Sequence, residues 1–106
     1  MKKLRFLCIC QYGHSRSVAL ARVLHGMGHE AIPIGYGTSP SSITPLGEWA
    51  DMILIVDRGA WFLVNSATQL KNKSHDFDVG PDRWVNPYHP ELQTIFEAMV
   101  KERLFN

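Results

Sequence analysis

The apolar residues of the chain fall into short, nearly continuous runs that alternate with segments of helical periodicity. Runs of this kind are typical of parallel strands that are covered on both faces. In the second run Pro33 lacks a backbone N–H, which favours a position at the edge of a sheet. The predicted strands are residues 4–10, 30–36, 51–57 and a short fourth strand at residues 76–79.

The segments between the strands, and the segment after the last one, have apolar residues at the spacing of a helix face. Thr44 followed by Pro45 predicts an N-cap and the first residue of a helix. Residues 71–75 are polar and charged, and we expect them to form a connection. The predicted helices are residues 18–27, 44–50, 58–67 and a last helix from Pro90 onward.

The alternation of strands and helices predicts one α/β domain across residues 1–106. The expected architecture has three layers, αβα, around a four-stranded parallel sheet. Ligands of such sheets bind beyond the carboxyl ends of the strands. We expect residues 10–17, Asp57 and residues 80–82 to converge at that edge.

Composition narrows the classes of partner. A net charge of +1, with 45% hydrophobic and 20% charged residues, is typical of an ordinary globular protein and provides no basic surface for nucleic acid or membranes. The chain shows no export signal, and no run approaches the roughly 18 apolar residues of a membrane span. Cys8 and Cys10 lie in one predicted strand and cannot link distant parts of a fold, which favours a reducing, cytoplasmic setting.

The candidate chemistry follows the first predicted strand, in the sequence CQYGHSRS. A loop between a strand and a helix can turn its backbone N–H groups toward a phosphate, and the helix dipole adds to the attraction. These groups also favour a thiolate at Cys10. Arg16 can hold two phosphate oxygens, and the Ser17 hydroxyl can donate to the sulfur. The predicted phosphate-binding residues are Gln11, Tyr12, Gly13, His14, Ser15, Arg16 and Ser17.

Each of these residues also has a purely structural interpretation. Cys10 would be a buried thiol at the end of a strand, and Ser15 and Ser17 would cap the helix. A cation in the first helical turn is unfavourable unless an anion lies nearby, so the position of Arg16 favours phosphate binding. Asp57 ends the third strand and is interpreted as a helix N-cap instead of a catalytic group.

The pattern C-x-x-x-x-x-R-S after the first strand resembles the low-molecular-weight protein tyrosine phosphatases. Residues 49–57 (WADMILIVD) resemble the third strand of that family, and Pro81-Asp82 looks like the loop that carries its general acid. The resemblance covers almost the whole chain and implies an α/β phosphatase that needs no cofactor. It implies the following roles: Cys10 as nucleophile, Arg16 as phosphate clamp, Ser17 as thiolate partner and Asp82 as general acid and base.

The loop also departs from the family. The residues QYGH stand where small residues and a structural asparagine are usual, and the family's second loop cysteine, which would align near Ser15, is absent. These departures bear on the substrate more than on the fold. Asp78 is an alternative general acid, or a residue that orients the loop or Arg16. Trp84 and Tyr88 are candidates for stacking on an aromatic leaving group, with packing as their simpler role.

The remaining histidines and the second cysteine do not suggest a metal site. His25, His29 and His75 have no partners at metal-ligand spacing, and we expect them on the surface. Cys8 is expected in the core. The sequence predicts neither a metal nor another cofactor.

The leading hypothesis is a cysteine-dependent phosphatase that hydrolyses phosphate monoesters, phosphotyrosine among them, through a phosphocysteine intermediate. Its substrate would be a phosphorylated protein or a small phosphorylated molecule. One alternative is a non-catalytic module that binds a phosphorylated ligand in the same cradle. Another is a phosphocarrier-type cysteine protein, which does not need an arginine at the position of Arg16. The sequence is silent on oligomeric state.

Overall fold

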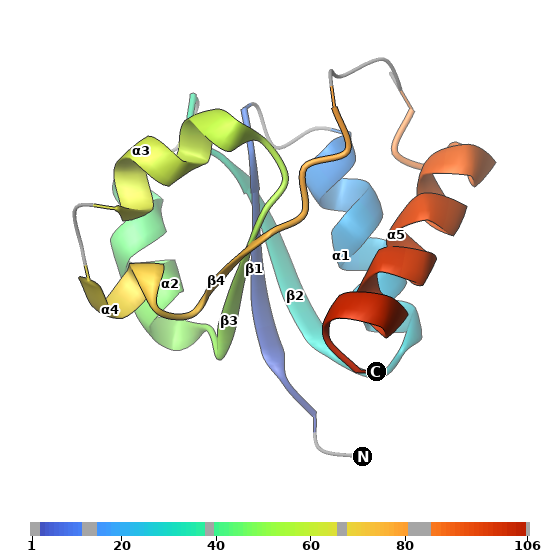
Figure 1. Cartoon of the computed structure of the whole chain (residues 1–106), viewed down its shortest axis with the longest axis horizontal. Coiled ribbons are helices and arrows are strands. Elements are labelled where there is room, and N and C mark those ends of the chain that lie inside the picture. Colours follow the sequence, from blue (N-terminus) through green and yellow to red (C-terminus); the bar gives the residue numbers. More distant parts are fainter. Residues whose placement is uncertain (1–2, 12–14, 38–39, 66–67, 81–85, 106) are drawn as a thin grey trace.

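The computed structural model describes residues 3–11, 15–37, 40–65, 68–80 and 86–105. At its centre lies a four-stranded sheet in which every pairing is parallel (Figure 1). In the order β2-β1-β3-β4, β1 is central and β2, which contains Pro33, is an edge strand. The predicted sheet and the predicted edge are confirmed. The strands are β1 (Arg5–Cys10), β2 (Glu30–Gly35), β3 (Met52–Ile55) and β4 (Ser74–Asp76).

Helices cover both faces of the sheet, which confirms the αβα layering (Figure 1). One face carries α1 (Arg16–Gly26) and α5 (Pro90–Arg103), which also contact each other. The other face carries shorter elements: the 3₁₀ turns η1 (Pro40–Ser42) and η2 (Arg58–Ala60), and the helices α2 (Ile43–Trp49), α3 (Trp61–Val64) and α4 (Thr68–Lys71). Within the described segments, no helix has the length and apolar character to cross a bilayer.

The central strand β1 supplies both halves of the core. Phe6, Cys8 and Cys10 point toward α1 and α5, whereas Leu7 and Ile9 point to the opposite layer. This alternation is the pleat of the strand, and burial on both faces explains the unbroken apolar run. Burial, with the neighbouring Cys10 as a second cause, raises the pKa of the Cys8 thiol well above its usual range. Cys8 is therefore an inert core residue, as predicted.

Two predicted boundaries on the second face are wrong. Helix α2 begins at Ile43 with Ser42 as its N-cap, so Thr44 is not the cap. The buried Ile43 anchors the first turn on the sheet, and the preceding turn η1 leads directly into the helix. The segment from residue 58 also differs from the single predicted helix, because η2 precedes α3 and α3 ends at Val64.

The fourth strand lies earlier in the chain than the sequence indicated. β4 spans Ser74–Asp76 and pairs with β3 through Ile53 opposite Ser74 and Ile55 opposite Asp76. The polar residues 71–75 were expected to form a connection, but they include the end of α4 and most of this strand. A strand at an exposed edge can be polar because backbone pairing holds it, so its apolar pattern is weak.

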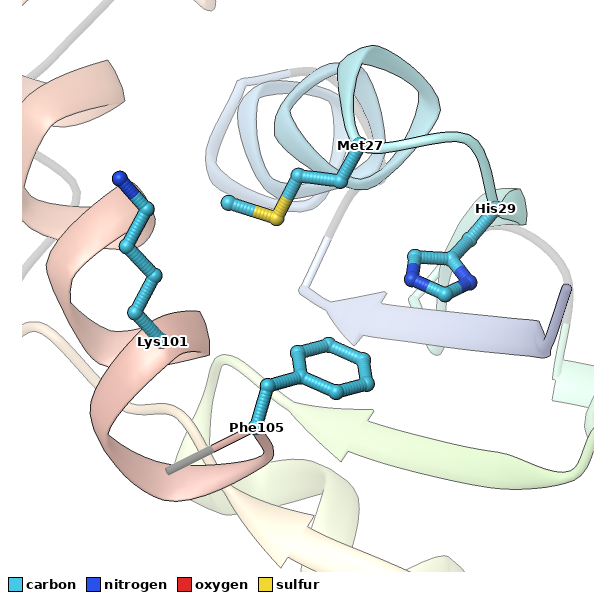
Figure 2. Close-up of a pocket in the computed structure, with 4 residues that line it drawn as sticks. All are labelled: Met27, His29, Lys101 and Phe105. Carbon is cyan, nitrogen blue, oxygen red and sulfur yellow. The ribbon is translucent and has the colours of Figure 1, made fainter. Parts of the chain in front are cut away.

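His29 is buried, which contradicts its predicted place on the surface, whereas His25 and His75 are exposed. The Leu4 N–H donates to His29 Nδ1 at 3.0 Å. The ring meets Phe6 edge-on and stacks on Phe105. Figure 2 shows His29 beside Phe105 in a pocket that is also lined by Met27 and Lys101. One hydrogen bond and two aromatic contacts hold this ring in the interior, although its Nε2 has no hydrogen-bond partner among the described residues.

Two phenylalanines provide a matched test of this packing. Phe96 on α5 is fully buried and Phe62 on α3 is 86% exposed. We expect Phe96→Ala to lower the free energy of unfolding by about 3–5 kcal/mol, because it removes buried area and leaves a cavity. Phe62→Ala should change it by less than about 0.5 kcal/mol. Urea denaturation of both variants measures the difference, and equal effects would contradict the described core.

Candidate active site

The predicted motif joins the end of β1 to the start of α1. Cys10 is the last residue of the strand and Arg16 is the first residue of the helix. Both residues are buried, with 3% and 4% exposure, and Ser17 is fully buried. Of the connecting residues, Gln11 and Ser15 lie in the described part of the chain, and the Gln11 carbonyl accepts from the Gly37 N–H at 2.7 Å. The strand and the helix predicted on either side of the cradle are therefore present.

Cys10 and Ser17 form a close pair. The Cys10 Sγ donates to the Ser17 Oγ at 3.0 Å. Once the thiol has lost its proton, the hydroxyl can reverse the bond and donate to the sulfur. The structure thus brings together the predicted nucleophile and its predicted thiolate partner.

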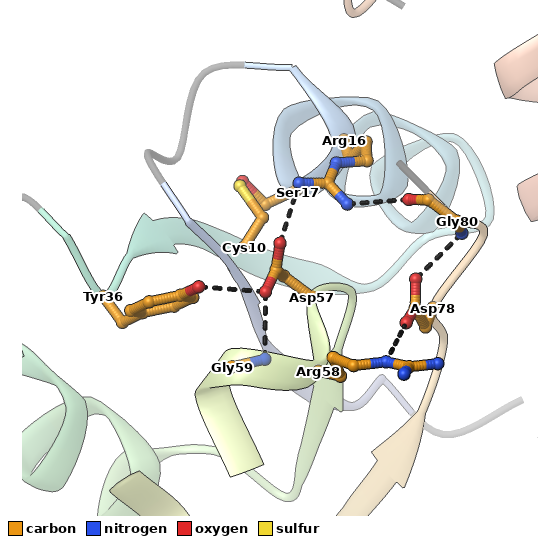
Figure 3. A network of polar contacts seen from close by, with 9 residues as sticks. All are labelled: Cys10, Arg16, Ser17, Tyr36, Asp57, Arg58, Gly59, Asp78 and Gly80. Carbon is orange, nitrogen blue, oxygen red and sulfur yellow. Dashed lines mark hydrogen bonds and ion pairs between the residues drawn. The ribbon is translucent and has the colours of Figure 1, made fainter. Parts of the chain in front are cut away.

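The Arg16 guanidinium is held from two sides (Figure 3). Its Nη2 donates to Asp57 Oδ2 at 3.0 Å, and its Nη1 donates to the Gly80 carbonyl at 3.0 Å. The first turn of α1 contains no acidic residue, so the ion pair to Asp57 comes from another element of the fold. A cation at the N-terminus of a helix opposes the helix dipole, and this ion pair offsets that cost.

Asp57 follows β3 and uses both carboxylate oxygens. While Oδ2 faces Arg16, Oδ1 accepts from the Tyr36 hydroxyl and from the Gly59 N–H, each at 2.9 Å. Burial alone would raise the pKa of Asp57. The hydrogen bonds from Gly59, Tyr36 and Arg16, with the Arg16 charge, outweigh burial and hold that pKa below its usual value. Asp57 is therefore ionised at neutral pH.

Gly59 is required for this arrangement. A Cβ at position 59 would clash with the Tyr36 hydroxyl and ring. The Tyr36 side chain can approach Asp57 only because residue 59 has no side chain. Tyr36 and Gly59 were not among the sequence-predicted site residues, and their positions after β2 and β3 were the available signal.

The prediction for Asp57 is confirmed in one respect and incomplete in another. It is the N-cap of η2, and its side chain accepts from Gly59, as a cap does. Its ion pair with Arg16 was not predicted from the sequence. The parallel pairing of β1 with β3 places the ends of both strands at one edge, and this is why residues 41 positions apart meet.

Asp78 belongs to a neighbouring part of the same network. Its Oδ1 accepts from the Gly80 N–H at 2.8 Å, and its Oδ2 lies 3.6 Å from Arg58 Nε. Gly80 has a φ of +93°, a left-handed conformation that glycine adopts without a steric penalty. Asp57 and Gly80 thus converge on Arg16, as predicted for this edge of the sheet.

Several sequence-predicted residues lie outside the described part of the chain, namely Tyr12, Gly13, His14, Asp82 and Trp84. Tyr88 is described and is 59% exposed. The Arg22 guanidinium lies over its ring at 4.0 Å from the centroid. Contact of Tyr88 with a substrate stays a prediction.

Because the pKa of Asp57 is lowered in the folded protein, the free energy of unfolding should depend on pH. A carboxyl whose pKa is lower in the folded state contributes stability that is complete above roughly pH 5 and is lost as the pH falls through the folded value. We expect Asp57→Asn to lower the free energy of unfolding by about 2 kcal/mol at pH 7. The difference from wild type should shrink below about pH 4. Urea denaturation from pH 7 to pH 3 measures it, and a constant difference would contradict the ion pair.

Comparison with known proteins gives one informative result. No family model and no curated protein matches the chain by sequence. Among solved structures, the fold is similar to the YwlE arginine phosphatase from Geobacillus stearothermophilus, a member of the low-molecular-weight protein tyrosine phosphatase family. The TM-score is 0.66 at 16% identity, over 93% of this chain and 92% of the other. The chain therefore has the αβα fold of that phosphatase family, which the motifs in its sequence predicted.

Proposed function

We propose that the protein is a cysteine-dependent phosphatase that hydrolyses phosphate monoesters. The observation that carries this proposal is the Cys10–Ser17 pair beside a buried, doubly held Arg16, at the junction of a strand and a helix N-terminus. A thiol, a hydroxyl partner and a fixed guanidinium are the groups that phosphoryl transfer through cysteine needs. The fold shared with an arginine phosphatase supports the same reaction class.

In the first step the Cys10 thiolate attacks the phosphorus of the substrate. The S–P bond forms as the bond to the leaving oxygen breaks, and that oxygen takes a proton from a general acid. We assign the acid to Asp82, which lies outside the described residues. Arg16 and the amides at the start of α1 stabilise the charge on the equatorial oxygens.

In the second step the same carboxylate takes a proton from a water molecule, whose oxygen attacks the phosphocysteine. The S–P bond breaks and its electron pair returns to the sulfur. As that bond breaks, the Ser17 hydroxyl donates to the sulfur and stabilises its developing negative charge, which makes it a better leaving group. Phosphate leaves, and the Cys10 thiolate is ready for another cycle.

The fixed guanidinium explains how the site would select a phosphoryl group. Arg16 is planar, and Asp57 and Gly80 each hold one of its terminal nitrogens. A planar group held at two points has a defined orientation, and guanidinium donors match a pair of phosphate oxygens. The ion pair also offsets the desolvation of Arg16 before any substrate arrives.

The proposed substrates are phosphorylated proteins or small phosphorylated molecules in a cytoplasmic setting. The structural neighbour is named as an arginine phosphatase, so a phosphoarginine substrate belongs in the test panel beside phosphotyrosine. The mechanism assigned to Cys10, Arg16 and Asp82 requires no cofactor, no nucleic acid and no membrane.

Hydrolysis of an aryl phosphate tests the nucleophile. We expect Cys10→Ser to reduce kcat/KM by about 10³-fold or more, because the serine hydroxyl is a far weaker nucleophile at neutral pH. Cys8→Ala is the matched control, since it removes the neighbouring thiol of the same strand, and it should retain activity if folded. Equal activity of wild type and Cys10→Ser would reject the mechanism. Phosphate binding without turnover on any substrate would favour the binding module.

The general acid is tested by varying the leaving group. We expect Asp82→Asn to lower kcat for an alkyl phosphate by about 10²–10⁴-fold, because a poor leaving group needs a proton. For an aryl phosphate with an acidic leaving group, the same substitution should lower kcat by a smaller factor. Glu97→Gln, an exposed change on α5, is the control. If both substrates respond equally to Asp82→Asn, another group supplies the proton.

A further inference from the structure

Asp57 and Arg58 are adjacent in the chain and belong to one closed series of contacts that includes Arg16 (Figure 3). Asp57 binds Arg16 directly, and Arg58 places its Nε 3.6 Å from Asp78 Oδ2. From Asp78 the contacts return through Gly80 to Arg16. The phosphate-binding arginine is thus tied to the end of β3 and to the segment after β4.

The link from Asp78 to Arg16 passes through one backbone carbonyl. Asp78 Oδ1 accepts from the Gly80 N–H at 2.8 Å, and the Gly80 carbonyl accepts from Arg16 Nη1 at 3.0 Å. The Asp78 N–H in turn donates to Asp76 Oδ1 at 2.9 Å, at the end of β4. Two successive aspartate turns therefore fix the path of the chain up to Gly80, and with it the direction of its carbonyl.

We propose that Asp78 is a positioning residue of the site, and that it acts by holding the Gly80 carbonyl against Arg16. This inference rests on the proposed function for the role of Arg16 in binding a phosphoryl group. Asp57 fixes one terminal nitrogen of the guanidinium, and the carbonyl fixes the other. Both contacts are needed to define the plane in which Arg16 meets two phosphate oxygens.

The same contacts argue against Asp78 as the general acid of the proposed reaction. An acid must carry a proton toward the leaving oxygen at the start of the reaction. Here one carboxylate oxygen accepts from an amide and the other faces a guanidinium. The Asp78 side chain is 19% exposed and is bound to the scaffold, whereas Arg58 is 90% exposed. The contact to Gly80, and not the solvent-screened ion pair, therefore carries the effect.

The experiment measures the binding of inorganic phosphate, by titration calorimetry, and the steady-state kinetics of aryl phosphate hydrolysis. Asp78→Asn keeps an oxygen that can accept from Gly80, so we expect near-wild-type phosphate affinity. Asp78→Ala removes that acceptor and should weaken phosphate binding about tenfold, because a hydrogen bond to a charged group is misplaced. KM should rise with it, while the basic limb of the kcat–pH profile stays in place.

Two further variants make the result specific. Gly80→Ala strains a residue at φ +93° while it leaves Asp78 and Arg58 intact, and a Cβ there meets nothing within 4 Å. Gly80→Ala should therefore weaken phosphate binding, as Asp78→Ala does. Asp51→Ala is the matched control. Asp51 also accepts from a backbone N–H and pairs with an arginine, Arg5, but it lies at the opposite end of the sheet. Its loss should leave phosphate affinity unchanged.

The outcomes separate this inference from the proposed function. If Asp78→Asn and Asp78→Ala both abolish kcat and leave phosphate affinity unchanged, Asp78 is the acid and the inference is overturned. It is also overturned if folded Asp78→Ala and Gly80→Ala bind phosphate as wild type does. If the affinities change as expected but wild type hydrolyses no substrate, the inference stands and the phosphatase proposal fails. A wild type that does not bind phosphate overturns both.

Discussion

The ion pair between Arg16 and Asp57 is the interaction on which the rest of the site depends. The Arg16 side chain is 5% exposed, so its guanidinium loses most of its hydration, and at the N-terminus of α1 it also opposes the helix dipole. Asp57, which follows β3, compensates for both costs, and the Gly80 carbonyl satisfies a second nitrogen. Removal of either partner would leave a buried donor without its acceptor, so the cradle and the fold are stabilised together.

The parallel sheet makes this compensation possible. Every strand ends at the same edge, and each contributes one member of the site there: Cys10 at the end of β1, Tyr36 after β2, Asp57 after β3 and Gly80 after β4. β1 lies between β2 and β3, so Cys10 at its end lies between the ends of both neighbouring strands. The Tyr36 hydroxyl and the Gly59 amide then orient the carboxylate that orients Arg16.

Sequence patterns were informative where one physical requirement dominated. The central strand must be apolar on both sides, and α5 must begin near Pro90, so both were predictable. The patterns gave wrong predictions where tertiary contacts, and not the local sequence, determine the conformation or burial of a residue. Edge strand β4 is polar because backbone pairing to β3 holds it, and His29 is buried because Leu4 and two phenylalanine rings accommodate it.

The sequence by itself determined the fold class and the placement of a cysteine at the end of a strand and an arginine at the start of the next helix. Those features depend on the spacing of residues that are near one another in the chain, which can be read directly from the sequence. Only the tertiary structure decided that Asp57 and Gly80 hold Arg16, since these residues lie 41 and 64 positions away in the chain. Contacts at such separations follow from strand order and register, and no local pattern encodes them.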